Sequence, residues 1–349
     1  MKENYLSWNV NPDDFYDLKT QDEKLRFLLN FAVLAPSSHN SQPWSFVATE
    51  QSVDIYVNSS RLLTVSDKNR RQLYISLGCA LENLLVAADY YDIHGDVKYA
   101  KPLFGDGYFC NPAVEVDLNL DKDKKEYWAD AGHLIFSIPE RRTNRNKYDA
   151  QMPFEVNFLP FMQRLSQLDV MYDFVSDKIR KENIANVVLN AMSEAMADKN
   201  FRLELAEYVK SNYTSSGIGM PGFGMGIPGP VSLLLPFIIR HFDMYKVTRK
   251  QDESLLKDGT PMFGILSTRE DNPESWIKAG QAYQRIALEC ERAGIKTAVM
   301  AAAIQIGDYY KQLQEIIGTS ARPQLFFRIG YCNKEVHPSP RLSSAQVEG

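Results

Sequence analysis

Residues 77–93 read LGCALENLLVAADYYDI and residues 279–295 read AGQAYQRIALECERAGI. In both segments, small or apolar residues recur at positions i, i+3, i+4, i+7, i+8 and i+11, which is the pattern of one face of an α-helix. Gly78 and Gly280 occupy the same place in the two segments, 202 residues apart. Because glycine lacks a side chain, another part of the backbone can approach closely at each position. The sequence therefore predicts two similar helices with a close contact near the start of each.

This repeat indicates that the chain consists of two related halves. Two copies of one element in a single polypeptide are typical of a fused dimer, whose copies are related by a pseudo-twofold axis. A basic, polar hinge at residues 140–149 separates a first half, residues 1–139, from a second half, residues 140–349. The alternative is that two unrelated amphipathic helices look alike by chance.

Composition excludes several classes of protein. The chain has 349 residues, 44% of them hydrophobic, and a net charge of −5, so neither disorder nor a basic nucleic-acid surface is indicated. Its four cysteines and five histidines show no zinc or other metal spacing. The longest apolar run, residues 231–239, is far shorter than the roughly 20 residues that span a bilayer, and the amino terminus lacks a signal-peptide pattern. We therefore expect a cytoplasmic protein with no metal and no nucleic-acid or membrane partner.

The order of predicted elements places helices and strands in both halves. A polar and aromatic arm, residues 1–20, comes first. Periodicity predicts helices over residues 21–35, 67–91, 155–168, 178–212 and 276–293, and strands over residues 44–49, 52–58, 114–120, 170–176, 262–268 and 324–329.

Residues 215–230 are interpreted as a mobile lid. They contain six glycines and three prolines, a composition that does not favour regular structure. Gly217–Gly222 formally matches GxGxxG. However, no strand precedes it and Pro221 interrupts it, so we do not interpret it as a dinucleotide-binding motif.

Two polar segments could bind a ligand. The first is APSSHNSQPWSF, residues 35–46, where Pro36 ends a helix and Pro43 favours an extended path. Between the prolines, Ser37, Ser38, Asn40 and Gln42 present donors and acceptors. The alternative is a turn in which these side chains only cap the next strand.

The second polar segment is Arg141-Arg142-Thr143-Asn144-Arg145. Three guanidinium groups and a hydroxyl can make several charge-assisted hydrogen bonds to a phosphate, although a solvated basic turn would have the same composition. Ser339-Pro340-Arg341 alone indicates no function, but it would belong to the same site if Arg341 reached the same phosphate. The chain contains neither HExxH nor GxSxG, so no hydrolase or metalloprotease site is indicated.

These segments resemble motifs of the FMN-dependent nitroreductases. APSSHNSQPWSF resembles that family's PSxxNxQPWxF, and RRTNR is similar to its RxSxR motif. PSPR at residues 338–341 resembles its late Lys/Arg motif, and the helix from residue 279 resembles its AGxAxQNLxLAAxxxG helix. The arginine motif follows the serine-rich motif instead of preceding it. This order resembles the Acg-like branch, in which two nitroreductase-like halves are fused and a lid covers the flavin.

The resemblance implies an α+β fold, with a mixed, largely antiparallel sheet surrounded by helices in two pseudo-symmetric halves. It also implies one FMN site. Its phosphate would be held by Arg141, Thr143, Arg145 and Arg341, with Arg142 and Ser339 beside them. Pro36, Ser37, Ser38, Asn40 and Gln42 would line the rest of the flavin. No side chain need act as a catalytic acid or base, because the flavin carries the chemistry.

The function that this resemblance implies is an oxidoreductase. FMN would carry electrons from NADH or NADPH to a small-molecule acceptor such as a nitroaromatic or a quinone. The alternative is a non-catalytic protein that binds and sequesters FMN beneath a closed lid. A third reading keeps the enzyme but changes its reaction to oxygen-dependent flavin destruction or dehalogenation. We expect a monomer with an internal pseudo-dimer, or a homodimer of such chains.

Overall fold

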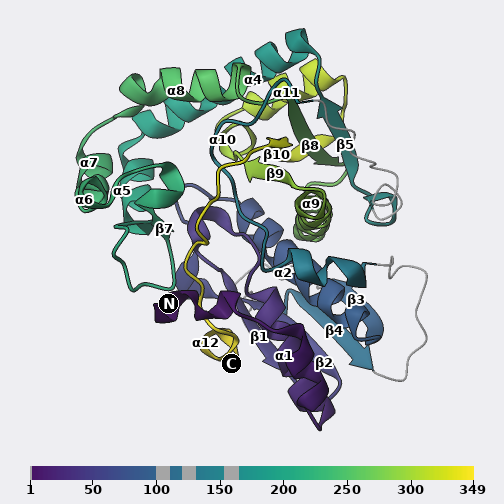
Figure 1. Ribbon diagram of the computed structural model, residues 1–349. Helices are drawn as coiled ribbons and strands as arrows, with labels where there is room; N and C mark the ends of the chain where they lie inside the picture. The colour runs from purple at the N-terminus through teal and green to yellow at the C-terminus, as the bar shows by residue number, and fades with distance from the viewer. Residues whose placement is uncertain (1, 100–110, 120–130, 153–164) are drawn as a thin grey trace.

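The computed structural model describes residues 2–99, 111–119, 131–152 and 165–349. Within these residues the chain forms two four-stranded sheets and a two-stranded one, with helices around them (Figure 1). Every ladder of the two large sheets is antiparallel, and only the small sheet is parallel. The predicted α+β class is confirmed, with the correction that two separate large sheets replace a single one.

The sheet of the amino half has the strand order β1-β2-β4-β3. Its strands are β1 (Trp44–Ala48), β2 (Ser52–Val57), β3 (His94–Tyr99) and β4 (Val114–Asn119). Helix α1 (Gln21–Ala32) precedes β1, and helix α2 (Arg71–Tyr90) connects β2 to β3. Buried and half-buried residues alternate along β1 and β2, as expected for strands with one face on the core.

The sheet of the carboxyl half has the strand order β5-β8-β10-β9. Its strands are β5 (Met171–Val175), β8 (Met262–Thr268), β9 (Ile295–Val299) and β10 (Arg322–Tyr331), and helix α9 (Pro273–Arg292) connects β8 to β9. In chain order, both sheets therefore run first, second, fourth, third, with a long helix between the second and third strands. This shared topology favours the predicted pair of related halves. The boundary at residues 139 and 140 stays a prediction.

Helices α2 and α9 cross between the two sheets (Figure 1). A Cβ atom on Gly78 would overlap the carbonyl oxygen of Ile277, and one on Gly280 would overlap that of Ile75. Gly78 thus contacts the residue three positions before Gly280, and Gly280 contacts the residue three positions before Gly78. This reciprocity is what a twofold contact requires, and it explains why both positions are glycine.

Buried polar side chains connect the same two helices. Glu82 accepts a 2.8 Å hydrogen bond from Nε of Arg285, and Gln284 donates a 2.6 Å hydrogen bond to the side-chain oxygen of Asn83. All four side chains are at most 5% exposed. With the 202-residue offset, Glu82 corresponds to Gln284 and Asn83 to Arg285, so the two contacts occupy equivalent positions. One is an ion pair and the other is a neutral hydrogen bond.

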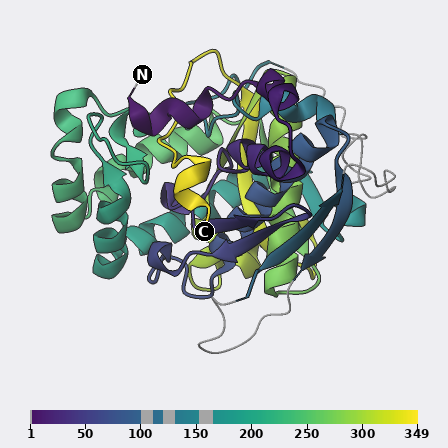
Figure 2. The same ribbon diagram turned by 90° about the horizontal axis from the view of Figure 1, so that it is seen from below.

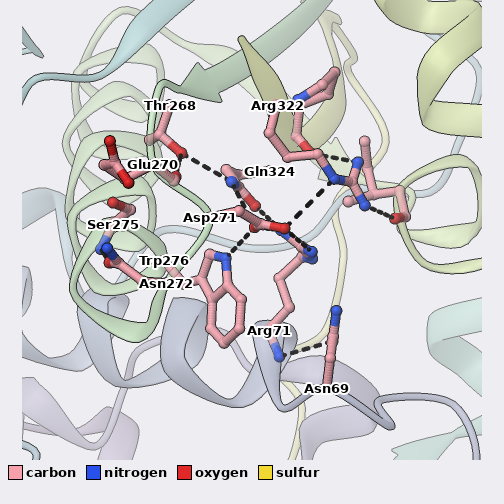
Figure 3. Close-up of polar contacts among 12 residues, drawn as sticks. Asn69, Arg71, Thr268, Glu270, Asp271, Asn272, Ser275, Trp276, Arg322 and Gln324 are labelled. Atoms are coloured by element: carbon pink, nitrogen blue, oxygen red, sulfur yellow. Dashed lines mark hydrogen bonds and ion pairs between the residues drawn. The ribbon is translucent and has the colours of Figure 1, made fainter. Parts of the chain in front are cut away.

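A second polar network joins the halves near the start of both helices (Figure 3). Arg71 of α2 pairs with Asp271, which lies just before α9. Trp276 donates a 2.7 Å hydrogen bond to Asp271, and Arg71 also donates to Gln324 of β10. Although burial acts to raise it, hydrogen bonds from Arg71 and Trp276 lower the pKa of Asp271 to about 2.

A long insertion between β5 and β8 has no counterpart in the amino half. Its elements are α4 (Lys178–Ala197), α5 (Lys199–Tyr208), β6 (Val209–Lys210), β7 (Met220–Pro221), η7 (Gly222–Met225), α6 (Gly229–Ser232), α7 (Leu235–His241) and α8 (Tyr245–Lys257). The prediction that residues 215–230 have no regular structure was wrong. Asn212 organises them, because its side chain accepts from the Phe223 amide at 2.7 Å and donates to the Ile227 carbonyl at 2.9 Å.

The remaining elements are short. They are η1 (Glu3–Trp8), η2 (Pro12–Asp17), η3 (Ser38–Asn40), η4 (Ser59–Arg61), η6 (Gly132–Ser137), α10 (Ala302–Gln305), α11 (Tyr309–Ile317) and α12 (Ser344–Val347). Most of the helix expected at residues 155–168 lies outside the described residues. Strand β3 was not predicted, because Gly95 and Asp96 are poor strand formers. No helix in the described part of the chain is long and apolar enough to cross a membrane.

Candidate functional site

The candidate site is a cleft of about 500 Å³, measured out to its open mouth, where the amino-terminal arm meets four other distant segments. The lining residues are Trp8, Pro36, Ser37, Asn40, Arg141, Arg142, Thr143, Arg145, Met220, Gly224, Val336, His337, Ser339 and Arg341. The cleft therefore brings together the two polar segments, the lid and the tail.

The serine-rich segment forms a tight turn between α1 and β1. Ser37 closes it, because its Oγ accepts a 2.9 Å hydrogen bond from the Gln42 amide. His39, Asn40 and Gln42 have φ angles of 52° to 53°, a conformation that costs a non-glycine residue free energy unless the surroundings hold it. His39 points away from the cleft toward Tyr208 of α5, and burial lowers its pKa to about 4.

The amide side chains of this turn hold it to the lid and the tail. Asn40 donates to the carbonyl oxygens of Gly219 and Pro340, both at 2.9 Å. Gln42 donates to the Gly217 carbonyl at 2.7 Å and accepts from the Leu342 amide at 3.0 Å. These contacts explain the strained backbone and make the turn the point at which lid and tail are anchored.

Arg341 approaches the turn from the tail. It is 4% exposed and donates to the side-chain oxygen of Asn40 and to the Ala35 carbonyl, the latter at 3.1 Å. Burial, together with the nearby Arg141 and Arg142, lowers its pKa well below the usual range. Arg341 thus positions the turn, and its Nε has no hydrogen-bond partner among the described residues.

The arginine segment forms one wall of the cleft. Arg141 is 2% exposed, and its Nε and Nη1 atoms have no hydrogen-bond partner within the described residues. Burial lowers its pKa. Thr143 forms an isolated β-bridge with Thr297 of β9, an edge strand of the second-half sheet. This bridge fixes the arginine segment. Arg145 has one described partner, the sulfur of Met220 at 3.9 Å from Nη2.

Below this wall, Arg328 of β10 supports the segment. It is 1% exposed and donates to the carbonyl oxygens of Asn144 and Asn146, both at 3.2 Å. The basic segment at residues 140–149 is therefore not the solvated basic turn that the alternative reading gave. Hydrogen bonds and the Thr143 bridge hold its first part against the second-half sheet.

Trp8 of the amino-terminal arm is a lining residue that the sequence analysis missed. Its ring lies 4.1 Å from the guanidinium carbon of Arg142 and 5.0 Å from that of Arg341. Its Nε1 donates a 2.8 Å hydrogen bond to the Ser339 carbonyl. Such stacking stabilises cations where carboxylates are absent, and no Asp or Glu is among the described residues that line the cleft.

The arm also fastens the lid. Asn4 donates to the Ser216 carbonyl at 2.9 Å, and Lys2 donates to the Tyr213 carbonyl at 3.0 Å. The Asn4 carbonyl accepts from the Arg341 amide at 2.9 Å. The amino-terminal arm and the carboxyl-terminal tail accordingly lie side by side (Figures 1 and 2).

Of the eleven residues predicted to bind the cofactor, nine line the cleft. Ser38 and Gln42 do not. Whether the nine contact a flavin stays a prediction. Besides Trp8, the structure adds Met220 and Gly224 from the lid and Val336 and His337 from the tail. Three of these had a signal in the sequence, because His337 directly precedes the PSPR motif and Met220 and Gly224 lie in the predicted lid.

Comparison with known proteins connects this arrangement to a family. No family model matches the chain. The chain is 23% identical to "Putative NAD(P)H nitroreductase acg" of Mycobacterium tuberculosis over 95% of its own length and 96% of that protein. It is 22% identical to "Probable NAD(P)H nitroreductase PigM" of a Serratia species, with 94% of each chain covered.

A solved structure agrees on the fold. The crystal structure of a nitroreductase from Anabaena variabilis, described as putative, matches 95% of this chain and 91% of its own, with a TM-score of 0.52 and 9% identity. Sequence relatives and fold thus agree over nearly the whole length. Over nearly its whole length the chain thus resembles proteins named NAD(P)H nitroreductases, and it shares the fold of a solved nitroreductase-like structure.

Proposed function

We propose that this protein binds one FMN per chain in the cleft and acts as an NAD(P)H-dependent oxidoreductase on a small-molecule acceptor. The observation that carries the proposal is the set of four arginines that line the cleft without any described acid. A cluster of cations that lacks carboxylates is suited to an anion such as a phosphate. The names of the nitroreductase relatives support the choice of reaction.

The residues present fit FMN. The buried guanidinium of Arg141 has two nitrogen atoms without a partner among the described residues, and an unsatisfied buried donor is costly unless a ligand accepts from it. Beside it, Ser37 and Thr143 add hydroxyl groups, and Trp8 and Met220 add apolar surface. A dianionic phosphate attached to a large aromatic ring system would satisfy both kinds of wall.

The chain's own residues would bind, orient and enclose the cofactor. Arg141 and Arg145 would hold the phosphate, while Arg328 and Arg341 would position the segments on either side. Bound FMN would accept electrons from NADH or NADPH and deliver them to an acceptor such as a nitroaromatic or a quinone. The lid, with Met220 and Gly224 at the cleft, would decide which acceptors reach it.

Absorbance of the purified protein between 300 and 600 nm tests the proposal. We expect a flavin spectrum with one FMN per chain, and we expect anaerobic NADH or NADPH to bleach it. In titrations with FMN, Arg145→Ala should weaken binding ten- to a hundredfold, since a charge-assisted hydrogen bond contributes about 1.5–3 kcal/mol. Lack of flavin binding would refute the site, whereas a bound flavin that neither nucleotide reduces would refute only the reaction.

A second function, FMN sequestration, is favoured by the anchoring of the lid. Arg145 contacts Met220, and Asn40, Gln42 and Asn4 all bond to lid carbonyls. Shortening the lid side chains with Met220→Ala and Phe223→Ala opens the cleft without removing these backbone contacts. If only this variant reduced an acceptor with NAD(P)H, the native protein would store FMN. If both forms turned over equally, sequestration would be excluded.

A further inference from the structure

Apolar side chains are exposed on the outer part of the insertion between β5 and β8. On α6, α7 and the start of α8, the exposed fractions are 60% for Leu233, 61% for Leu234 and 59% for Phe237. Val231, Phe242 and Val247 are also at least 48% exposed. With Met244, which is 37% exposed, seven large apolar residues are exposed within seventeen positions, a concentration that a surface without a partner rarely shows. We call residues 231–250 the apolar-basic segment.

Cations accompany these apolar residues. Between residues 240 and 250 the chain has Arg240, Lys246, Arg249 and Lys250 against a single acid, Asp243, although the whole chain carries a net charge of −5. Arg240, Lys246 and Lys250 are exposed, and none of them forms an ion pair with a described residue. The next acids are Asp252, which is half-buried, and Glu253, which pairs with Lys257 at 2.7 Å. The positive charge of the segment is therefore not neutralised within the described chain.

The segment lies at the periphery of the molecule. Figures 1 and 2 place α6 and α7 at the outer end of the insertion, away from both large sheets. A small core of Ala206, Val209 and Ile239 attaches them to α5 and β6, and only Ile239 and Ser232 of α6 and α7 are buried. Val231 of α6, Phe237 of α7 and the two leucines between these helices, Leu233 and Leu234, are thus exposed because no described element covers them.

We propose that the apolar-basic segment docks on a membrane surface that contains anionic lipids. Leu and Phe side chains beside exposed Lys and Arg are the composition of helices that lie in the lipid interface. Such a contact needs no spanning helix, so it is compatible with the absence of one in the described part of the chain. A second copy of the chain is a poorer occupant, because a twofold contact would bring two cationic clusters together.

Docking of the apolar-basic segment on a membrane would involve residues that are linked to the lid of the cleft. The side-chain oxygen of Asn212 accepts a hydrogen bond from the backbone amide of Phe223 in the lid. The backbone amide of Asn212 donates to the hydroxyl of Ser232 in α6 at 2.9 Å. The docking surface and the lid are therefore held by one residue. The proposal does not depend on the cofactor, and its test uses no activity measurement.

Flotation of the full-length protein with lipid vesicles tests the proposal. We expect binding to phosphatidylcholine vesicles that contain phosphatidylglycerol, at least about tenfold weaker binding to phosphatidylcholine alone, and weakening by salt. Leu234→Ser with Phe237→Ser should reduce binding at least about tenfold. Arg240→Gln and Lys250→Gln should each reduce it about fivefold, the equivalent of about 1 kcal/mol per cation.

Matched controls come from elsewhere on the surface. Ile179→Ser removes an apolar side chain that is 74% exposed on α4, and Lys98→Gln removes a cation that is 61% exposed on β3; neither should change binding. The proposal is overturned if anionic vesicles do not bind, or if the controls reduce binding as much as the segment variants. It is also overturned if sedimentation shows a dimer that Phe237→Ser dissociates while vesicles remain unbound.

Discussion

Two groups of buried arginines differ in what surrounds them. Arg71 and Arg285 lie between the halves, and each has a carboxylate partner, Asp271 and Glu82. Arg141 and Arg341 line the cleft, where the described residues supply carbonyls, an amide and the Trp8 ring but no acid. Both groups are as buried as each other, at 2% to 5% exposure.

This difference distinguishes the arginines that stabilise the fold from those that line the candidate site. A buried cation must be compensated, and in the seam between the halves the protein does so with its own carboxylates. In the cleft the compensation is incomplete, because two nitrogen atoms of Arg141 lack a partner among the described residues. We infer that the missing partner is the ligand. Three substitutions test this contrast.

Glu82→Ala should have the largest effect. It leaves Arg285 buried without its carboxylate, which costs about 3–5 kcal/mol of the free energy of unfolding. Gln284→Ala removes the equivalent neutral contact to Asn83 and should cost about 1–3 kcal/mol. Urea unfolding of both variants measures the two losses. Equal losses would contradict the view that the seam depends on the ion pair.

Arg141→Gln should behave in the opposite way. It removes a buried cation with two nitrogen atoms that lack a hydrogen-bond partner among the described residues, so the FMN-free protein should be as stable as the wild type or more stable. Its dissociation constant for FMN should rise ten- to a hundredfold, for a loss of about 1.5–3 kcal/mol.

The matched control is Arg322→Gln. Arg322 stacks at 3.3 Å on the Tyr310 ring and lies 3.8 Å from Asp271, so this variant should lose stability and keep its FMN affinity. If Arg141→Gln destabilised the FMN-free protein as much as Arg322→Gln, Arg141 would belong to the scaffold.

The comparison also shows how much of the fold and of the site could be predicted from the sequence. The glycine pair and the two polar segments were visible because each depends on a local pattern: a helical repeat, or two prolines around polar residues. The cleft residues missed by the sequence analysis lack such a pattern. Trp8 is a single aromatic residue in a polar arm, and its partner Ser339 lies 331 positions away. The pairing of Arg71 with Asp271 likewise spans 200 positions.

The roles of Asn40 and Gln42 illustrate the same limit. Their amides could serve a ligand or the chain, and the sequence does not distinguish these uses. In the structure both amides donate to lid carbonyls, Asn40 also donates to the Pro340 carbonyl of the tail, and Gln42 accepts from the Leu342 amide of the tail. Their effect on a ligand would be exerted through the turn that they anchor. The short elements of the lid were missed for a related reason, since Asn212 supplies contacts that glycine and proline content does not indicate.

Asp271→Asn should give the smallest effect and the most specific one. Because the Asp271 side chain is 42% exposed, we expect a loss of only about 1–2 kcal/mol at neutral pH. The folded-state pKa lies near 2, below the ordinary value of 3.8. The carboxylate therefore stabilises the fold fully above about pH 4, and this contribution disappears as the pH falls through 2.

The variant should accordingly show a flatter dependence of stability on pH between 4 and 2 than the wild type, measured by urea unfolding at several pH values. Arg71 would still have Gln324 as an acceptor, which is why the loss stays small. A wild-type slope in the variant would mean that Arg71 and Trp276 do not hold an ionised Asp271. The seam would then contain an uncompensated arginine like that of the cleft, and lack of an acid would no longer identify the site.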